Sequence, residues 1–253
     1  MFLQLLLSLL ATNAFTALPA NHIDLAVSHA KYGKSVDPWD SSFVYNADLT
    51  RCLRANGYQS VFIRGSNGTF DNNAVESIRN AHGAGLGVEI YMEPQPNSGV
   101  HGGQQLDTMI KGFSDNDIVI KSVWLKVSTA TDWPVSNSTA FISDIVRRAK
   151  QLSLKVGIYT SSADWSKISG AHWVRGYAVR LWYYSRSADP AYTGKPNFDD
   201  FVSFGGYKTP MFKQWSTWDF VCGYYMNRNI FALGNPENMP IADGKIVVGG
   251  IGL

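Results

Sequence analysis

The residues best suited to chemistry in this 253-residue chain are charged and hydroxyl side chains set within or just after short apolar runs. Asp37 closes "KSVD", Glu89 and Glu93 lie in "LGVEIYME", and Lys126 and Ser128 interrupt "SVWLKVS". A positioned carboxyl group can act as a general acid or base, since it can give a proton to a reacting group or take one from it. The three carboxylates are therefore the first candidates for catalytic residues.

The sequence lacks the motifs of serine-nucleophile and metal-dependent catalysis. No Gly-x-Ser-x-Gly elbow is present for a serine nucleophile, and no histidine follows an apolar run. The chain has two cysteines, Cys52 and Cys222, without Cys-x-x-Cys or His-rich spacing, so we expect no metal and no cofactor. Carboxylate chemistry remains, or binding without chemistry.

Strand-like and helix-like segments alternate, and they place these side chains at strand ends. Strands are expected at 34–38, 58–64, 86–93, 122–127, 154–160, 179–185 and 209–216, and helices at 42–56, 72–85, 103–113, 138–153 and 163–168. Strands separated by helices indicate a parallel sheet. We expect an α/β fold, an irregular TIM-like β/α barrel that lacks helices in its C-terminal third. A doubly wound open sheet is the alternative, but no Gly-x-Gly-x-x-Gly follows a strand.

Functional side chains of a parallel barrel lie at the carboxyl ends of its strands. Alternation puts Trp124, Lys126 and Ser128 on one face of their strand, and Glu89 and Glu93 on one face of the preceding one. If both faces line the lumen, we expect Lys126 to pair with Glu89, because burial of one charge without the other is costly.

The composition describes a globular protein with a large core, since 45% of residues are hydrophobic and 17% are charged. The 22 Lys and Arg against 20 Asp and Glu leave a net charge of +2 without any basic run, which argues against nucleic acid as a partner. Aromatic residues make up 13%, including eight Trp, a supply that suits sugar faces as well as packing.

The N-terminal "MFLQLLLSLLATNAFTA" predicts a signal peptide at residues 1–17, with Ala20 as the alternative cleavage site. It is too short to span a bilayer, and no membrane partner is expected. Residues 18–253 are expected to form one domain, with a poorly ordered tail from about 232. An extracellular location fits a Cys52–Cys222 disulfide and glycosylation at Asn67 and Asn137.

Several stretches together resemble the glycoside hydrolases of family 25, above all their secreted lysozyme-like branch of nematodes and amoebae. The resemblance spans about residues 36–231 and is most specific in "VGIYTSSADWSKI" and "FGGYKTPMFKQW". It implies an irregular barrel and muramidase activity, which cleaves the bond between N-acetylmuramic acid and N-acetylglucosamine in peptidoglycan. It also implies a role in antibacterial innate defence. We expect a monomer whose ligand is bacterial cell-wall glycan or another N-acetylated glycan.

The family typically carries an Asp at the end of the first strand. Asp37 matches this place, with Asp24 and Asp40 as alternatives. Members also carry an Asp-x-Glu on the fourth strand and an Asp after the eighth. Lys126 and Ser128 stand at the first two of these positions, and Asn227 at the third. The acid of the family is therefore missing from its expected position.

Two functions stay open at this point. The protein is a hydrolase whose acid has moved to Glu89 or Glu93, or it is an inactive glycan-binding protein. The candidate catalytic residues are Asp37, Glu89 and Glu93. The side chains expected to contact the glycan are Tyr91, Trp124, Lys126, Ser128, Trp182, Tyr184, Gln214, Trp215 and Asn227.

Overall fold

The structure, a computed structural model, describes residues 32–40, 42–134, 136–170, 178–185, 191–232 and 244–251. The expected signal peptide and Asp24 lie outside these residues. So do 233–243 and 252–253 of the expected tail. Another part of that tail forms a strand instead, because β10 (Ile246–Val248) pairs in parallel with β4 (Ile118–Ile120).

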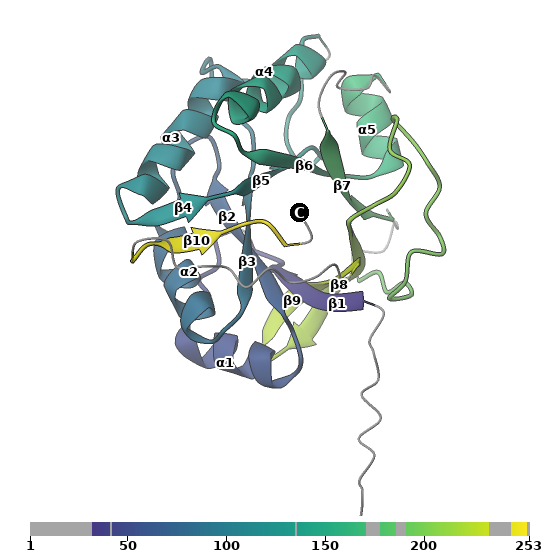
Figure 1. The fold of residues 1–253 in the computed structure, drawn as a ribbon. Helices are drawn as coiled ribbons and strands as arrows, with labels where there is room; N and C mark the ends of the chain where they lie inside the picture. Colours follow the sequence, from purple (N-terminus) through teal and green to yellow (C-terminus); the bar gives the residue numbers. More distant parts are fainter. Residues whose placement is uncertain are drawn as a thin grey trace, which may run out of the picture. The chain divides into compact units, whose positions relative to one another are not determined.

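Eight strands close into a barrel in the order β1-β2-β3-β5-β6-β7-β8-β9 (Figure 1). Their bounds are β1 (Tyr32–Pro38), β2 (Ser60–Ser66), β3 (Gly87–Met92), β5 (Ser122–Lys126), β6 (Lys155–Thr160), β7 (Val179–Tyr184), β8 (Phe212–Val221) and β9 (Tyr224–Ala232). Strands β1 to β8 pair in parallel, whereas β9 is antiparallel to β8 and β1. The predicted irregular barrel is confirmed, and the open sheet is wrong.

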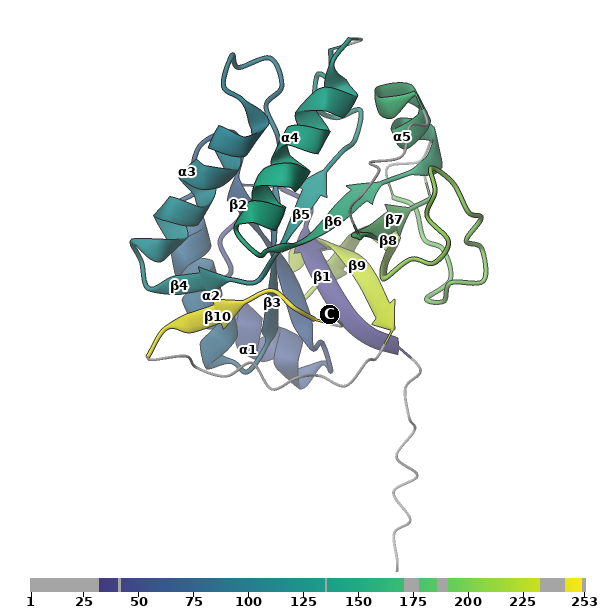
Figure 2. The same cartoon turned by 45° about the horizontal axis from the view of Figure 1, so that its top comes forward.

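In the part of the chain that the structure describes, the helices α1 to α5 lie outside the barrel (Figures 1 and 2). They are α1 (Ala47–Ala55), α2 (Asn73–Gly83), α3 (Gly102–Ser114), α4 (Ser138–Gln151) and α5 (Ser162–Ser169). After α5 the described residues contain no further helix, as the sequence predicted. Pro196, Gly205, Gly206 and Pro210 in the irregular segment before β8 disfavour a helix there.

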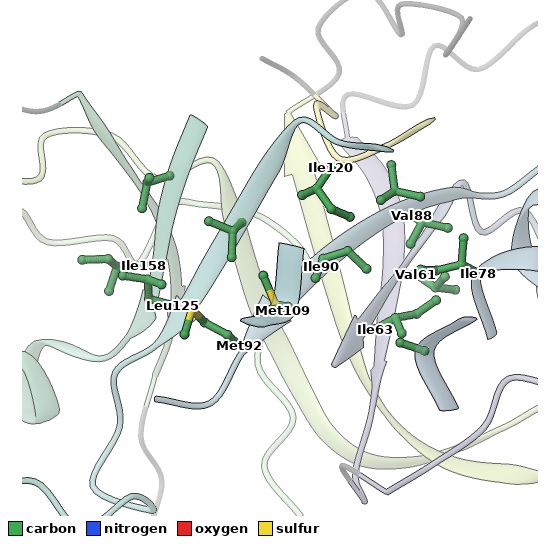
Figure 3. Close-up of a cluster of buried hydrophobic side chains, with 14 of the residues drawn as sticks. Val61, Ile63, Ile78, Val88, Ile90, Met92, Met109, Ile120, Leu125 and Ile158 are labelled. Atoms are coloured by element: carbon green, nitrogen blue, oxygen red, sulfur yellow. The ribbon is translucent and has the colours of Figure 1, made fainter. Parts of the chain in front are cut away.

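The hydrophobic core has an outer part, between strands and helices, and an inner part within the barrel. Figure 3 shows apolar side chains of the outer part, which come from β2, β3, β4, β5 and β6 and from the helices α2 and α3. The inner part is aromatic, with Phe62 and Trp182 stacked at a centroid distance of 3.7 Å. Trp124 fills the space beside Gly157 so closely that a Cβ there would lie 2.1 Å from its ring. The lumen is thus a packed core below the strand ends.

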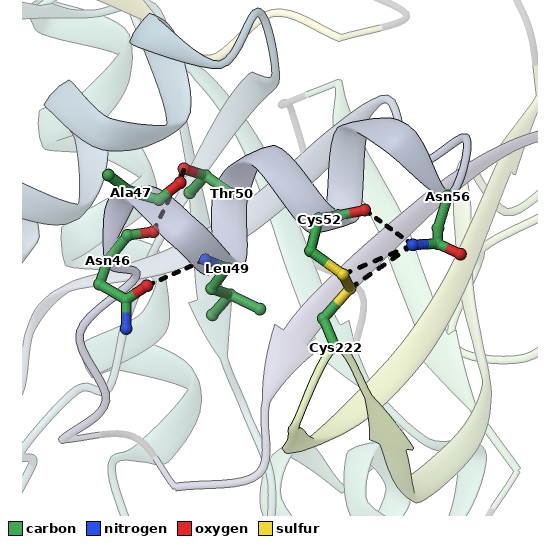
Figure 4. The surroundings of a disulfide bond; sticks show 7 residues. All are labelled: Asn46, Ala47, Leu49, Thr50, Cys52, Asn56 and Cys222. Atoms are coloured by element: carbon green, nitrogen blue, oxygen red, sulfur yellow. Dashed lines mark hydrogen bonds between the residues drawn. A yellow bond between two sulfur atoms is a disulfide. The ribbon is translucent and has the colours of Figure 1, made fainter.

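A disulfide joins Cys52 on α1 to Cys222 at the β8–β9 turn (Figure 4). The two Cα atoms are 6.0 Å apart, and 170 residues separate the cysteines in the sequence. The predicted bridge is confirmed. Cys222 and Gly223 both have positive φ, 52° and 89°, so the chain reverses sharply there and β9 returns along β8.

Candidate functional site

A pocket of about 350 Å³ opens at the carboxyl ends of the barrel strands. Its wall combines aromatic rings, hydroxyls and amides with two carboxylates and one ammonium. The lining residues are Asp37, Pro38, Trp39, Tyr91, Lys126, Ser128, Thr129, Ala130, Tyr159, Asp164, Trp182, Tyr184, Ser185, Tyr192, Gln214, Thr217 and Asn227. A mostly apolar concave wall with a few fixed polar groups is typical of a small-molecule site.

Asp37 is held by three amide side chains at the end of β1. Asn229 Nδ2 donates to Oδ1 at 2.6 Å, Asn227 Nδ2 donates to Oδ2 at 2.8 Å, and Gln214 Nε2 lies 3.2 Å from both oxygens. Burial raises the pKa of the Asp37 carboxyl, while the three amides and the charge of Lys126 oppose this rise. Asp37 is therefore a rigidly oriented hydrogen-bond acceptor.

Of the alternatives to Asp37, Asp40 is the one that the structure describes. Asp40 is exposed and accepts hydrogen bonds from the backbone and hydroxyl of Ser42, which lower the pKa of its carboxyl. Asp40 is not among the residues that line the pocket. The carboxylate that the first strand places in the pocket is Asp37.

Lys126 does not pair with Glu89, so that prediction was wrong. Its Nζ lies 2.6 Å from Oε1 of Glu93, and Arg64 Nη1 lies 3.3 Å from Oε2 of the same carboxylate. In the register of the two strands Tyr91 stands opposite Trp124, which brings Glu93 rather than Glu89 level with Lys126. Alternation identified the correct faces, but the register decides the partner.

Glu89 lies in the barrel core, away from the pocket. Its Oε2 accepts from Ser122 Oγ at 2.8 Å and Trp124 Nε1 at 2.7 Å, and its Oε1 accepts from the backbone N–H of Ile251 at 2.7 Å. Burial raises the pKa of the Glu89 carboxyl, and these donors partly offset the rise. This carboxylate is fully buried, is bound by the backbone of Ile251 after β10, and does not line the pocket.

Two expected contact residues also lie elsewhere. Trp124 is 2% exposed and belongs to the aromatic core of the barrel. The Trp215 ring lies 5.6 Å from the Arg228 guanidinium and does not line the pocket. Its neighbour Gln214 faces the pocket, so alternation along β8 turns Trp215 to the other face.

Comparisons with known proteins decide the family. The family described as "Lysozyme-like protein 1" matches residues 29–215. Lysozyme-like protein 2 of Caenorhabditis elegans is 43% identical over 246 residues, which cover 91% of this chain and 87% of that protein. Probable GH family 25 lysozyme 2 of Dictyostelium discoideum is 34% identical over 197 residues, which cover 75% of this chain and 88% of the relative. The chain belongs to the lysozyme-like proteins of glycoside hydrolase family 25.

Solved structures agree with this family-25 assignment at the level of fold. A family GH25 lysozyme from Aspergillus fumigatus superimposes with a TM-score of 0.62 at 20% identity, covering 81% of this chain and 95% of that one. A muramidase from Trichobolus zukalii gives a TM-score of 0.61 at 21% identity, covering 80% and 95%. The irregular barrel of this lysozyme-like protein is the fold of those enzymes.

At Ser128, which the resemblance to family 25 aligned with the acid of the family, the structure has a hydroxyl. Ser128 Oγ is buried in the pocket wall and has no hydrogen-bond partner among the described residues. At the neighbouring position the ammonium of Lys126 is bound to Glu93, which itself does not line the pocket. No carboxyl group therefore stands where the Asp-x-Glu of the family would place two.

Sequence reasoning missed the second carboxylate of the pocket, Asp164. It lies in the first turn of α5 and accepts hydrogen bonds from Thr129 Oγ1 at 2.9 Å and from the hydroxyl of Tyr184. A helix N-cap in the sequence could have indicated Asp164. Ser161 caps α5 by accepting a hydrogen bond from the backbone N–H of Asp164. Other lining residues that were missed are Pro38, Trp39, Thr129, Ala130, Tyr159, Ser185, Tyr192 and Thr217.

Within the part of the chain that the structure describes, no three His, Cys, Asp or Glu side chains lie close enough together to hold a metal ion. Among the same residues, no helix combines the length and apolar character needed to cross a membrane.

Asp37 should make folding stability depend on pH in a specific direction. Its pKa is raised in the folded chain above the ordinary value of 3.8, so the folded state keeps the proton to higher pH than the unfolded state does. Its contribution to the free energy of unfolding is thus greatest below pH 3.8 and falls as the pH rises through the raised pKa. Asp37→Asn should remove this fall. Urea unfolding across mildly acidic pH checks this, and parallel curves for the two proteins would contradict it.

Proposed function

We propose that this lysozyme-like protein binds the glycan strands of bacterial peptidoglycan in the pocket and does not cleave them by the acid-catalysed route of its family. The observation that carries the proposal is the pair of side chains at the Asp-x-Glu position. An ammonium held by Glu93 and a buried hydroxyl replace the two carboxyls there, while the buried Asp37 and the aromatic wall are in place.

The pocket offers what an N-acetylated sugar would bind. Aromatic rings present flat apolar faces for the C–H faces of a sugar ring, and the lining residues Trp39, which is 47% exposed, and Tyr184, which is partly exposed, can offer such faces. The Asp37 carboxylate can accept a hydrogen bond from an acetamido N–H or a hydroxyl. The ammonium of Lys126 can donate to a carbonyl or hydroxyl oxygen at the same wall.

The same groups lack a suitable proton donor. A glycosidic oxygen leaves with a proton from a neutral carboxyl group. Both oxygens of Glu93 contact cations, and both oxygens of Asp164 accept hydrogen bonds from Thr129 and Tyr184. Asp37 receives amide donors on both of its oxygens, so both are already engaged as hydrogen-bond acceptors.

Slow hydrolysis is the second candidate function, and one observation favours it. Burial raises the pKa of Asp37, so this carboxyl holds a proton at a higher pH than an exposed aspartate would. In that case Asp37 would serve as the relocated acid, a role considered for Glu89 and Glu93 from the sequence alone.

We infer further that the protein is extracellular and takes part in antibacterial defence as a monomer. Support comes from the signal-like N-terminus, from the disulfide, which is typical of oxidising compartments, and from relatives named as lysozyme-like proteins or probable lysozymes. Asn67 and Asn137, the two expected glycosylation sites, are both exposed. Mass spectrometry of the exported protein would test their modification.

Replacing Asp37 should weaken glycan binding. Asp37→Asn keeps the size of the side chain but removes its charge, and loss of a charge-assisted hydrogen bond reduces affinity by roughly tenfold or more. Titration calorimetry with soluble chito-oligosaccharides measures this. Asp40→Asn is the matched control, since Asp40 lies three residues along the chain and outside the pocket, and its affinity should stay within about twofold of wild type. Equal affinities for all three proteins would overturn the proposed pocket.

A further inference from the structure

An exposed row of aromatic rings leads from the pocket onto the hairpin of β8 and β9. Its members are Trp39, Trp218, Tyr225 and Phe220, here called the aromatic row, with exposed fractions of 47%, 43%, 52% and 66%. The ring centroids are 5.9 Å apart for Trp39 and Trp218, 5.3 Å for Trp218 and Tyr225, and 5.4 Å for Tyr225 and Phe220. The row is therefore one continuous apolar surface, of a kind that usually marks an interaction site.

The aromatic row is continuous with the pocket. Trp39 belongs to both, since its ring also lines the pocket wall. Thr217, the residue before Trp218, also lines the pocket, and so does Asn227 on the paired strand β9. A polymer that fills the pocket and extends beyond Trp39 would meet the row directly.

Trp218 has a strained backbone conformation. The register between β8 and β9 shifts between Ser216 and Asp219, and Trp218 has φ of 58°, in the left-handed region that bulky side chains rarely adopt. Its N–H donates to Asn227 Oδ1 at 3.2 Å, and Nδ2 of the same amide donates to Asp37. A strained backbone that exposes a large ring, fixed by the amide that holds Asp37, points to a functional position.

We propose that the aromatic row binds the part of a β-linked N-acetylated glycan polymer that extends out of the pocket. This inference rests on the proposed function of the pocket and adds the polymer as the preferred ligand over short oligosaccharides. Tyr and Trp rings give large, rigid contact surfaces at a small loss of conformational freedom. Sugar rings of successive units would stack on Trp218, Tyr225 and Phe220, and the row would hold the protein on the insoluble wall.

The test compares a polymer with a ligand short enough to fill only the pocket. Phe220→Ser combined with Tyr225→Ser should lower the affinity for insoluble peptidoglycan, measured by co-sedimentation, by roughly tenfold. Affinity for a soluble chitotriose, measured by calorimetry, should stay within about twofold because neither residue lines the pocket. Val202→Ser is the control, since Val202 is 79% exposed and lies outside both the pocket and the row.

A second variant separates binding from folding. Trp218→Gly removes the ring and suits the left-handed backbone, so its thermal unfolding temperature should equal or exceed that of the wild type while peptidoglycan binding falls. A lower unfolding temperature together with unchanged peptidoglycan binding would show that the ring is structural, and would overturn the proposal.

The two proposals fail separately. If the double variant binds peptidoglycan as the wild type does, the row is not a glycan site, whatever chitotriose does. If chitotriose does not bind the wild type while peptidoglycan binding still needs the row, the row stands and the pocket proposal fails. Row-dependent self-association, or row-dependent binding to phosphatidylcholine–phosphatidylglycerol vesicles, with unchanged peptidoglycan affinity would also overturn the inference.

Discussion

A Lys126→Asp, Ser128→Glu variant is expected to release reducing ends from purified peptidoglycan about a hundredfold faster than the wild-type chain, or more. Ser128 lies in the pocket wall, and its hydroxyl has no partner among the described residues, so a glutamate there would present a carboxyl group to the ligand. A positioned proton donor accelerates such reactions by about 10² to 10⁴-fold. Adding Asn227→Asp would restore the remaining family carboxylate next to Asp37.

The matched control places amide side chains of the same size at both positions. Lys126→Asn with Ser128→Gln removes the same ammonium and hydroxyl but supplies no proton, so it should remain as inactive as the wild type. Both variants free Glu93 from Lys126, so any loss of stability affects them equally and is measured by thermal unfolding. Equal reducing-end release from the acid variant and this control would contradict the account.

Glu89→Ala is expected to lower the free energy of unfolding by about 3 kcal/mol or more and to leave chitotriose affinity within about twofold of wild type. The substitution leaves Ser122 Oγ, Trp124 Nε1 and the Ile251 N–H without their acceptor and opens a cavity in the barrel core. Urea unfolding measures the loss of stability.

Glu76→Ala is the control for Glu89→Ala, since Glu76 is exposed on α2 and its loss should change stability by less than about 0.5 kcal/mol. A Glu89→Ala protein that kept its stability but lost glycan binding would return Glu89 to the list of candidate site residues.

The strand pattern was enough to predict the barrel, because helix and strand periodicities alternate clearly as far as α5. It was also enough to place Lys126 and Glu93 on facing surfaces, because alternation along a strand is local. The strand pattern could not predict the register between β3 and β5, because neither strand alone determines that Tyr91 stands opposite Trp124. The expected partner, Glu89, therefore lies four residues before the observed one, Glu93, along the chain.

The amide cradle of Asp37 was only partly predicted, for a different reason. Gln214 and Asn227 were expected in the site, but Asn229 was not, because β9 was not expected as an antiparallel strand. That strand depends on the reversal at Cys222 and Gly223, where both residues take positive φ. Once β9 lies against β1, Asn227 stands opposite Asp37, and Asn229 reaches the same carboxylate. Long-range pairing, not local propensity, builds this part of the site.

Reducing-end release from purified peptidoglycan by the unmodified protein tests the central claim most directly. The account predicts that the protein co-sediments with the peptidoglycan, while reducing ends stay at the level given by the Asp37→Asn variant over a long incubation at mildly acidic and neutral pH. Time-dependent release by the wild type that Asp37→Asn abolishes would show that the pocket carries a working acid, and would contradict the claim.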